Sequence, residues 1–120
     1  MNLSQIIKTL VSEIKLTEIQ AKIFLHVVIN GKMNTSKISD DLKISIEDAT
    51  QNSKKLVELG GFIDMPNDEF EAMHPRFTAV NMYRKMCERE QKEFKKNLTV
   101  DNIGVALEVS YDDARTKYNK

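Results

Sequence analysis

The sequence has little of the residues that build disulfide-stabilised or linker-rich proteins. It contains one cysteine, two prolines, four glycines and no tryptophan among 120 residues. A single cysteine excludes an intrachain disulfide, so we expect a reducing compartment, the cytoplasm. So few prolines and glycines leave little room for linkers, and the sequence contains neither repeats nor low-complexity tracts.

Long apolar runs and an excess of one charge are also missing. The longest apolar stretch, residues 23–29, is interrupted by His26, whereas a membrane span needs about 20 apolar residues. The N-terminus lacks a signal-peptide pattern, so we expect neither a membrane protein nor a secreted one. Eighteen basic residues balance eighteen acidic ones. This balance excludes nucleic-acid binding through bulk positive charge but leaves room for a local basic face.

The apolar spacing predicts a series of amphipathic helices. Apolar residues three and four apart indicate a helix over residues 4–15, with Ser4 as its N-cap. Thr17 and Gln20 form a capping box for a second helix, which we expect to end at Asn30-Gly31. Asn34 or Thr35 begins a short third helix.

A fourth helix follows after the brief turn Lys43-Ile44. Ser45 is its N-cap, and Gly60-Gly61 ends it. We expect five residues on its inner side: Ile46, Ala49, Ser53, Leu56 and Val57.

The pattern then changes to that of a β-hairpin. Two short apolar-rich segments, residues 62–65 and 69–73, flank the turn-forming sequence Pro66-Asn67-Asp68. A long helix without glycine is predicted from Arg76 to about Lys96. Residues 97–120 indicate two short helices, the second beginning with a Ser110–Asp113 capping box.

This order of elements predicts a mostly α fold with a small β-hairpin wing, a winged helix-turn-helix. Its DNA-binding domain is expected to span residues 1–75, including the N-terminal helix 4–15. Residues 76–120 would form a C-terminal helical extension that carries the dimer contacts and a basic helix.

Three segments also resemble the TrmB-type archaeal transcriptional regulators. LTEIQAKIFL at residues 16–25 resembles their opening helix, and KMNTSKISDDLKIS at residues 32–45 resembles their second helix and turn. KLVELGGFID at residues 55–64 resembles the end of their recognition helix with the first wing strand. The resemblance covers residues 16–75. It implies DNA binding as a homodimer, with the helix 45–58 in the major groove.

The chain departs from this family in two respects. Glu47 and Asp48 stand where family members commonly carry basic or small polar residues. The residues after the wing are too few for the family's sugar-binding domain, so sugar sensing is not implied.

Base contacts are expected from the outer side of the fourth helix. Gln51 and Asn52 can pair with adenine, and Lys55 can bond to guanine. Glu47 or Asp48 can accept a hydrogen bond from cytosine, although both also fit helix-dipole stabilisation. The other expected DNA contacts, chiefly to phosphate, are Thr35, Ser36, Lys37, Ser45, Lys54, Arg76, Arg84 and Lys85.

The charges are unevenly distributed along the chain. Residues 74–96 hold seven basic and three acidic residues, whereas residues 64–73 hold four acidic residues and no basic one. The basic segment either attracts phosphate or is a solvated helix face with i,i+4 ion pairs. The acidic wing either points away from DNA, binds a protein, or serves as a solubilising loop.

A homodimer interface is predicted on the helix after the wing. Val80, Tyr83, Cys87 and Phe94 recur on one side of it, although Glu90 breaks the series. Cys87 is therefore interpreted as a packing or interface residue rather than a nucleophile. Of the two histidines, we expect His26 to be packed and His74 to lie in a loop.

Signatures of catalysis are absent from the sequence. It contains no phosphate-binding glycine loop, zinc-protease motif or paired cysteines. We therefore expect neither an enzyme nor a metal or cofactor site. The favoured function is transcriptional regulation by a homodimer on double-stranded DNA. The alternative is a winged-helix module for protein–protein contacts, which the zero net charge and the acidic wing favour.

Overall fold

Local capping determines where the first two helices begin. In the computed structural model, which describes residues 1–118, α1 (Leu3–Ile14) follows Asn2 rather than Ser4, because Asn2 and Gln5 form a reciprocal capping box. The predicted box of Thr17 and Gln20 begins α2 (Glu18–Asn30). Gly31, with a φ of 91°, ends α2.

The two central helices also begin as predicted. Asn34 caps α3 (Thr35–Leu42), and Ser45 caps α4 (Ile46–Glu58). Ala49, Ser53 and Leu56 are buried on the inner side of α4, and Val57 is half-buried. Ile46 differs from the prediction, since it is 48% exposed at the first position of the helix.

A small antiparallel sheet joins the segments before α3 and after α4. The predicted hairpin consists of β2 (Ile63–Met65) and β3 (Glu69–Glu71). The short strand β1 (Met33–Asn34) pairs with β3, so the strand order is β1-β3-β2. The sequence did not predict β1, because two residues are too few to show a strand period.

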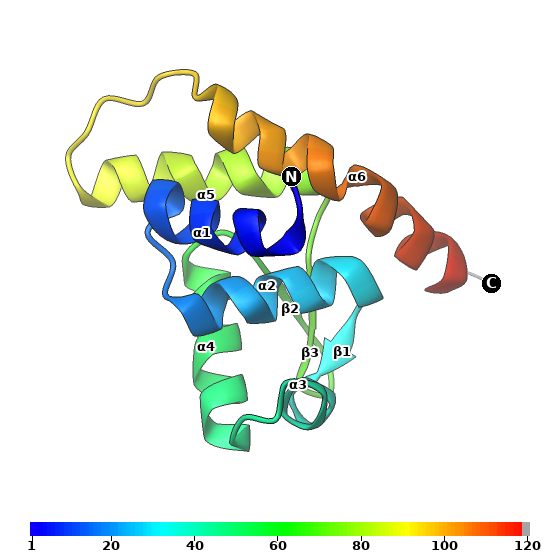
Figure 1. The fold of residues 1–120 in the computed structure, drawn as a ribbon. Helices are drawn as coiled ribbons and strands as arrows, with labels where there is room; N and C mark the ends of the chain where they lie inside the picture. Colours follow the sequence, from blue (N-terminus) through cyan, green and yellow to red (C-terminus); the bar gives the residue numbers. More distant parts are fainter. Residues whose placement is uncertain (119–120) are drawn as a thin grey trace.

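The C-terminal segment forms two helices that lie side by side (Figure 1). Helix α5 (Pro75–Arg89) is shorter than predicted, and α6 (Leu98–Tyr118) is one helix rather than two. Ser110 lies inside α6, so the predicted capping box there is wrong. Gly104 allows the close packing, since a Cβ atom at this position would lie 2.6 Å from Cα of Arg76.

The residues predicted to form a dimer interface differ in their burial within the chain. Cys87 is 1% exposed inside the chain, and Val80 and Tyr83 pack against the core. Phe94 lies beyond the end of α5 and is 48% exposed, with its ring 6.0 Å from that of Tyr83. The four residues therefore do not form one exposed helix face.

One hydrophobic core spans both halves of the chain. Helix α2 contacts α1, α4 and α6, and the residues of α6 join the same core as those of α1 and α2. The rings of Phe24, Phe62 and Phe70 form a row at centroid distances of 6.1 and 6.0 Å, which ties the hairpin to α2. Within residues 1–118, none of the helices is long and apolar enough to span a membrane.

Candidate nucleic-acid interface

The turn between α3 and α4 is closed by a single serine. The hydroxyl of Ser39 donates to the carbonyl oxygen of Ile44 at 2.6 Å, and its own carbonyl accepts from the Ile44 amide at 3.1 Å. Lys43 takes a left-handed conformation, with a φ of 56°, at the end of α3. These bonds let α4 begin at Ile46, with only three residues between it and the end of α3.

Helix α3 is attached to α2 by a polar chain. Asn30 donates to Nδ1 of His26 at 3.2 Å, so Nε2 carries the proton and donates to Asp41 at 2.8 Å. Lys37 donates to the other Asp41 oxygen at 2.9 Å. The bond from His26, and then that from Lys37, lowers the pKa of the Asp41 carboxyl. His26 is thus a hydrogen-bonded contact between two helices.

The outer side of α4 is exposed. Glu47, Gln51, Lys54 and Lys55 all lie on it. Lys55 pairs with Glu58 at 3.1 Å, and Asp48 lies in the first turn, where its backbone N–H donates to the capping hydroxyl of Ser45. The exposed groups thus include an amide, two ammonium groups and at least one carboxylate.

Two residues predicted to contact DNA point elsewhere. The side-chain amide of Asn52 donates to the Asp48 carbonyl at 2.9 Å, and its oxygen accepts from Gln20 at 3.4 Å. Thr35 is buried at the start of α3. Thr35 is therefore buried and the Asn52 amide is bonded within the protein, so neither side chain joins the exposed groups of α4.

The remaining predicted residues of α3 and the turn stay accessible. Ser36, Lys37 and Ser45 are exposed at the first turns of α3 and α4. Lys37 reaches Asp41, one turn further along α3. We call these groups, together with the exposed side of α4, the α3–α4 surface.

The basic residues of α5 do not join the α3–α4 surface. Figure 1 shows α5 and α3 on opposite sides of α2. Arg76 pairs with Glu108 on α6 at 2.9 Å, and Arg84 pairs with Glu88 at 2.8 Å. Lys85 lies against Gly60, at the C-terminal end of α4. The ion pairs of this segment match the alternative of a solvated helix face.

The acidic hairpin lies beside one of the exposed lysines. Lys54 shares the lining of a shallow depression of about 240 Å³ with Asp64 and Asp68. The two carboxylates reduce the positive potential around the Lys54 ammonium group. The hairpin therefore weakens, rather than extends, the basic character of the α3–α4 surface.

His74 takes part in a cluster that sequence reasoning missed. Its Nδ1 accepts from the Arg76 amide at 3.2 Å and so caps α5, while Nε2 lies 3.7 Å from Glu108. Possible ligand atoms of His74, Glu108 and Asp112 lie within 4.8 Å of one another. Because Nδ1 accepts a hydrogen bond, Nε2 carries the proton and points it at Glu108. Glu108 is also paired with Arg76, so the cluster is a polar network that links the start of α5 to α6.

Comparison with known proteins adds no assignment to this geometry. No family model, curated protein or solved structure matches the chain.

Proposed function

We propose that this chain is a winged helix-turn-helix DNA-binding regulator of the TrmB type, with α4 as its recognition helix. The observation that carries the proposal is the α3–α4 surface: two helices joined by a three-residue turn, with one side of the second helix exposed. The hairpin that follows α4 pairs with β1 from the segment before α3. This arrangement supports a wing placed beside the recognition helix.

The side chains of the α3–α4 surface suit contacts to duplex DNA. Gln51 can pair with adenine, and Lys55 can bond to guanine once it leaves Glu58. Ser36, Lys37 and Lys54 can contact phosphates on either side of the groove. Gln51 is therefore the residue we expect to contribute most to sequence preference.

In the proposed function, the protein binds as a homodimer to a two-fold symmetric DNA site. In such a complex the two copies of α4 lie about 34 Å apart, so that they enter successive major grooves. Because Asp64 and Asp68 lie beside Lys54, we expect each chain to neutralise few DNA phosphates and to bind DNA of random sequence weakly.

The direct test compares Lys54→Ala with Lys95→Ala. Both lysines are exposed, but Lys95 lies in the segment between α5 and α6, outside the α3–α4 surface. Fluorescence anisotropy with duplex DNA should give weaker binding and a salt slope reduced by about one unit per chain for Lys54→Ala alone. An equal effect of both variants would contradict the assignment of the α3–α4 surface. No binding by the parent protein at low salt would contradict DNA binding itself.

One observation favours a second candidate, a protein–protein interaction module. Ile46 is 48% exposed beside Glu47 and Asp48, and Ile63 is exposed on the hairpin beside Asp64. Apolar side chains rimmed by carboxylates suit a partner with a basic, partly apolar surface better than they suit phosphate. In this case the parent protein would not bind duplex DNA even at low salt.

A further inference from the structure

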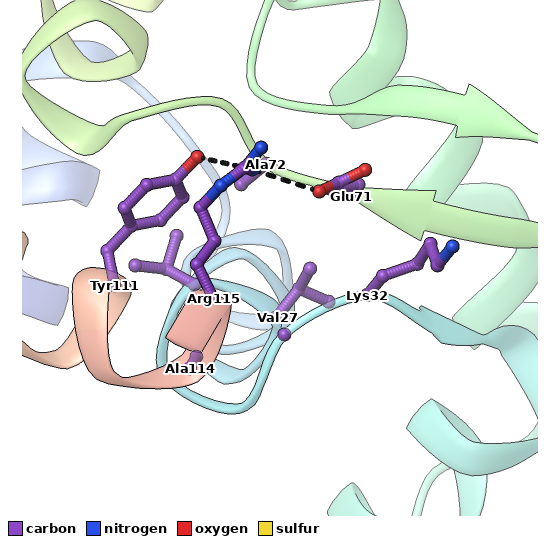
Figure 2. Close-up of a pocket in the computed structure, with 9 residues that line it drawn as sticks. Val27, Lys32, Glu71, Ala72, Tyr111, Ala114 and Arg115 are labelled. Atoms are coloured by element: carbon purple, nitrogen blue, oxygen red, sulfur yellow. Dashed lines mark hydrogen bonds and ion pairs between the residues drawn. The ribbon is translucent and has the colours of Figure 1, made fainter. Parts of the chain in front are cut away.

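A cavity lies where the hairpin meets the last helix, away from the α3–α4 surface. It is bounded by the end of α2, by β3 and by the C-terminal part of α6, and its volume is about 170 Å³ (Figure 2). A cavity of ~150 Å³ is large enough for a benzene ring. The cavity is therefore large enough for one aromatic ring or a branched apolar group of similar size.

The inner lining is apolar. Val27 and Val28 come from α2, Ala72 follows β3, and Ala114 lies on α6, all of them buried. The ring of Tyr111, also buried, forms a further wall. Two alanines among the lining residues leave space that larger side chains would fill, and an apolar ring or branched chain suits this space.

The polar groups of the cavity lie at its edge. Arg115 and Lys32 supply two cations, and Glu71 supplies one carboxylate. Figure 2 shows Arg115 reaching from α6 to a place between Tyr111 and Glu71. An arginine side chain at this edge suits an anion better than a cation of the same shape.

The guanidinium group of Arg115 retains donors for such an anion. It donates from Nη1 to Glu71 at 3.1 Å and from the same Nη1 to the Tyr111 hydroxyl at 2.8 Å. Among the contacts of the described residues, Nε and Nη2 are thus left to donate. These two nitrogens form the edge of a guanidinium that binds a carboxylate through two parallel hydrogen bonds.

We propose that this cavity binds a small monocarboxylate with an aromatic or branched apolar body. The apolar body would enter between α2 and α6, and the carboxylate would bond to Arg115 at the edge. Because Arg115 also pairs with Glu71 of β3, the ligand and the hairpin would both be bound by the same arginine side chain. This inference does not depend on DNA binding, since none of the residues that line the cavity belongs to the α3–α4 surface.

The probe for the test is benzoate, compared with three molecules that each lack one property. Toluene lacks the charge, acetate lacks the apolar body, and benzylammonium reverses the charge. Titrations followed by ¹H–¹⁵N NMR should show saturable shifts around Ala72 and Ala114 for benzoate, with a Kd below about 1 mM. The three other molecules should bind at least about tenfold more weakly.

Two variants separate the carboxylate contact from the apolar space. Arg115→Gln removes the charged donor from an exposed side chain and should weaken benzoate binding by about tenfold or more. Ala114→Leu fills the cavity and should abolish binding. Arg84→Gln, an exposed arginine on α5, is the matched control and should bind as the parent does.

Three results would overturn the proposal. The first is the lack of saturable shifts near the cavity with benzoate at millimolar concentration. The second is equal binding of benzoate and acetate, which would indicate surface attraction to cations. The third is unchanged benzoate affinity in Arg115→Gln. That variant decides the outcome even if Ala114→Leu fails to fold. DNA binding of the parent protein, measured separately, tests the proposed function independently.

Discussion

Ser53 shows how one buried side chain can work against the fold that surrounds it. It lies on the inner side of α4 with no exposed surface, and its hydroxyl lacks a hydrogen-bond partner among the described residues. A buried hydroxyl without a partner costs about 1–3 kcal/mol of stability. Ser53 thus occupies an inward-facing position of α4, although its polar side chain does not suit the apolar surroundings there.

Replacing this hydroxyl should therefore stabilise the protein. We expect Ser53→Ala to raise the free energy of unfolding by about 1 kcal/mol, since the variant removes the buried polar atom and alanine favours the helix. Urea unfolding measures the change. Ser12→Ala, at an exposed position of α1, is the control for helix propensity alone. A loss of stability in Ser53→Ala would show that the hydroxyl has a favourable contact.

The contact between α3 and α2 depends on pH, because it includes the carboxylate of Asp41. This carboxylate accepts hydrogen bonds from His26 and Lys37, and these bonds lower its pKa below the ordinary value of an aspartate. Because the folded-state pKa is lower than the unfolded one, the stabilising contribution is fully present above the unfolded pKa. It is lost as the pH falls through the folded pKa.

The variant Asp41→Asn should remove this dependence. At pH 7 we expect a lower Tm than that of the parent protein, and the difference should shrink as the pH falls below about 4. Thermal unfolding monitored by circular dichroism between pH 3 and pH 7 measures it. Asp40→Asn, an exposed neighbour on α3, is the control. A difference between Asp41→Asn and the parent that stays constant with pH would contradict the role of the carboxylate charge.

At the scale of elements, Gly104 determines how closely α6 can approach α5. Alanine in place of a helical glycine normally stabilises a helix by about 1 kcal/mol. Here the added Cβ would lie 2.6 Å from Cα of Arg76 and 3.0 Å from its backbone nitrogen. A clash with backbone atoms cannot be relieved by a change of rotamer, so the two helices would have to separate.

We therefore expect Gly104→Ala to lower the free energy of unfolding by about 1–3 kcal/mol, opposite in sign to the propensity effect. Ala106→Gly, at an exposed position of the same helix, reports the propensity effect alone and should cost about 1 kcal/mol. Chemical denaturation of both variants gives the comparison. Stabilisation by Gly104→Ala would mean that α6 can move away from α5 at little cost.

The elements that could be predicted from the sequence are those that local interactions define. Thr17 with Gln20 and the lone Ser45 mark helix starts because their partners lie three residues away. Strand β1 escaped prediction, since its two residues are ordered by pairing with β3, which lies far along the chain. The sequence did not predict α6 as one continuous helix for a similar reason. The role of Gly104 within that helix becomes apparent only from its close contact with α5.

In the candidate site, too, the features set by local sequence could be predicted and those set by distant contacts could not. The exposure of Gln51 and Lys54 follows from helical spacing, and both lie where the sequence placed them. Asn52 shares their spacing but turns towards Gln20, which lies 32 residues earlier in the chain. The cavity beside Arg115 was not predicted at all, since α2, β3 and α6 meet there only in the folded chain.

At the scale of the whole molecule, the balance of charge decides between the two proposed functions. The formal net charge is zero, so DNA attraction has to come from the local arrangement of charges on the α3–α4 surface. Its lysines are accompanied by Glu47 at the start of α4 and by the carboxylates of the hairpin. The effect of removing one of these carboxylates therefore depends on what the surface faces.

Glu47 is the most informative position for this test. A carboxylate about 4–8 Å from phosphate is repelled by roughly 1 kcal/mol or less under screening. If α4 docks in the major groove, Glu47→Gln should strengthen binding to random duplex modestly and make it more tolerant of salt. The helix would lose about 0.3–1 kcal/mol of dipole stabilisation. If Glu47 accepts a bond from cytosine, the variant should instead weaken one preferred sequence and leave other sequences unaffected.

The remaining outcomes separate a protein interface from an unused surface. We expect the first result, stronger binding to random duplex, because Glu47 is exposed in the first turn of the proposed recognition helix. If α4 faces a protein, DNA binding should not respond, and the affinity for that partner should change. Anisotropy titrations on specific and random duplexes, in parallel with titration of any purified partner, distinguish these cases. No change in any titration would mean that the helix beginning at Ser45 is not the binding surface, and both proposed functions would then be wrong.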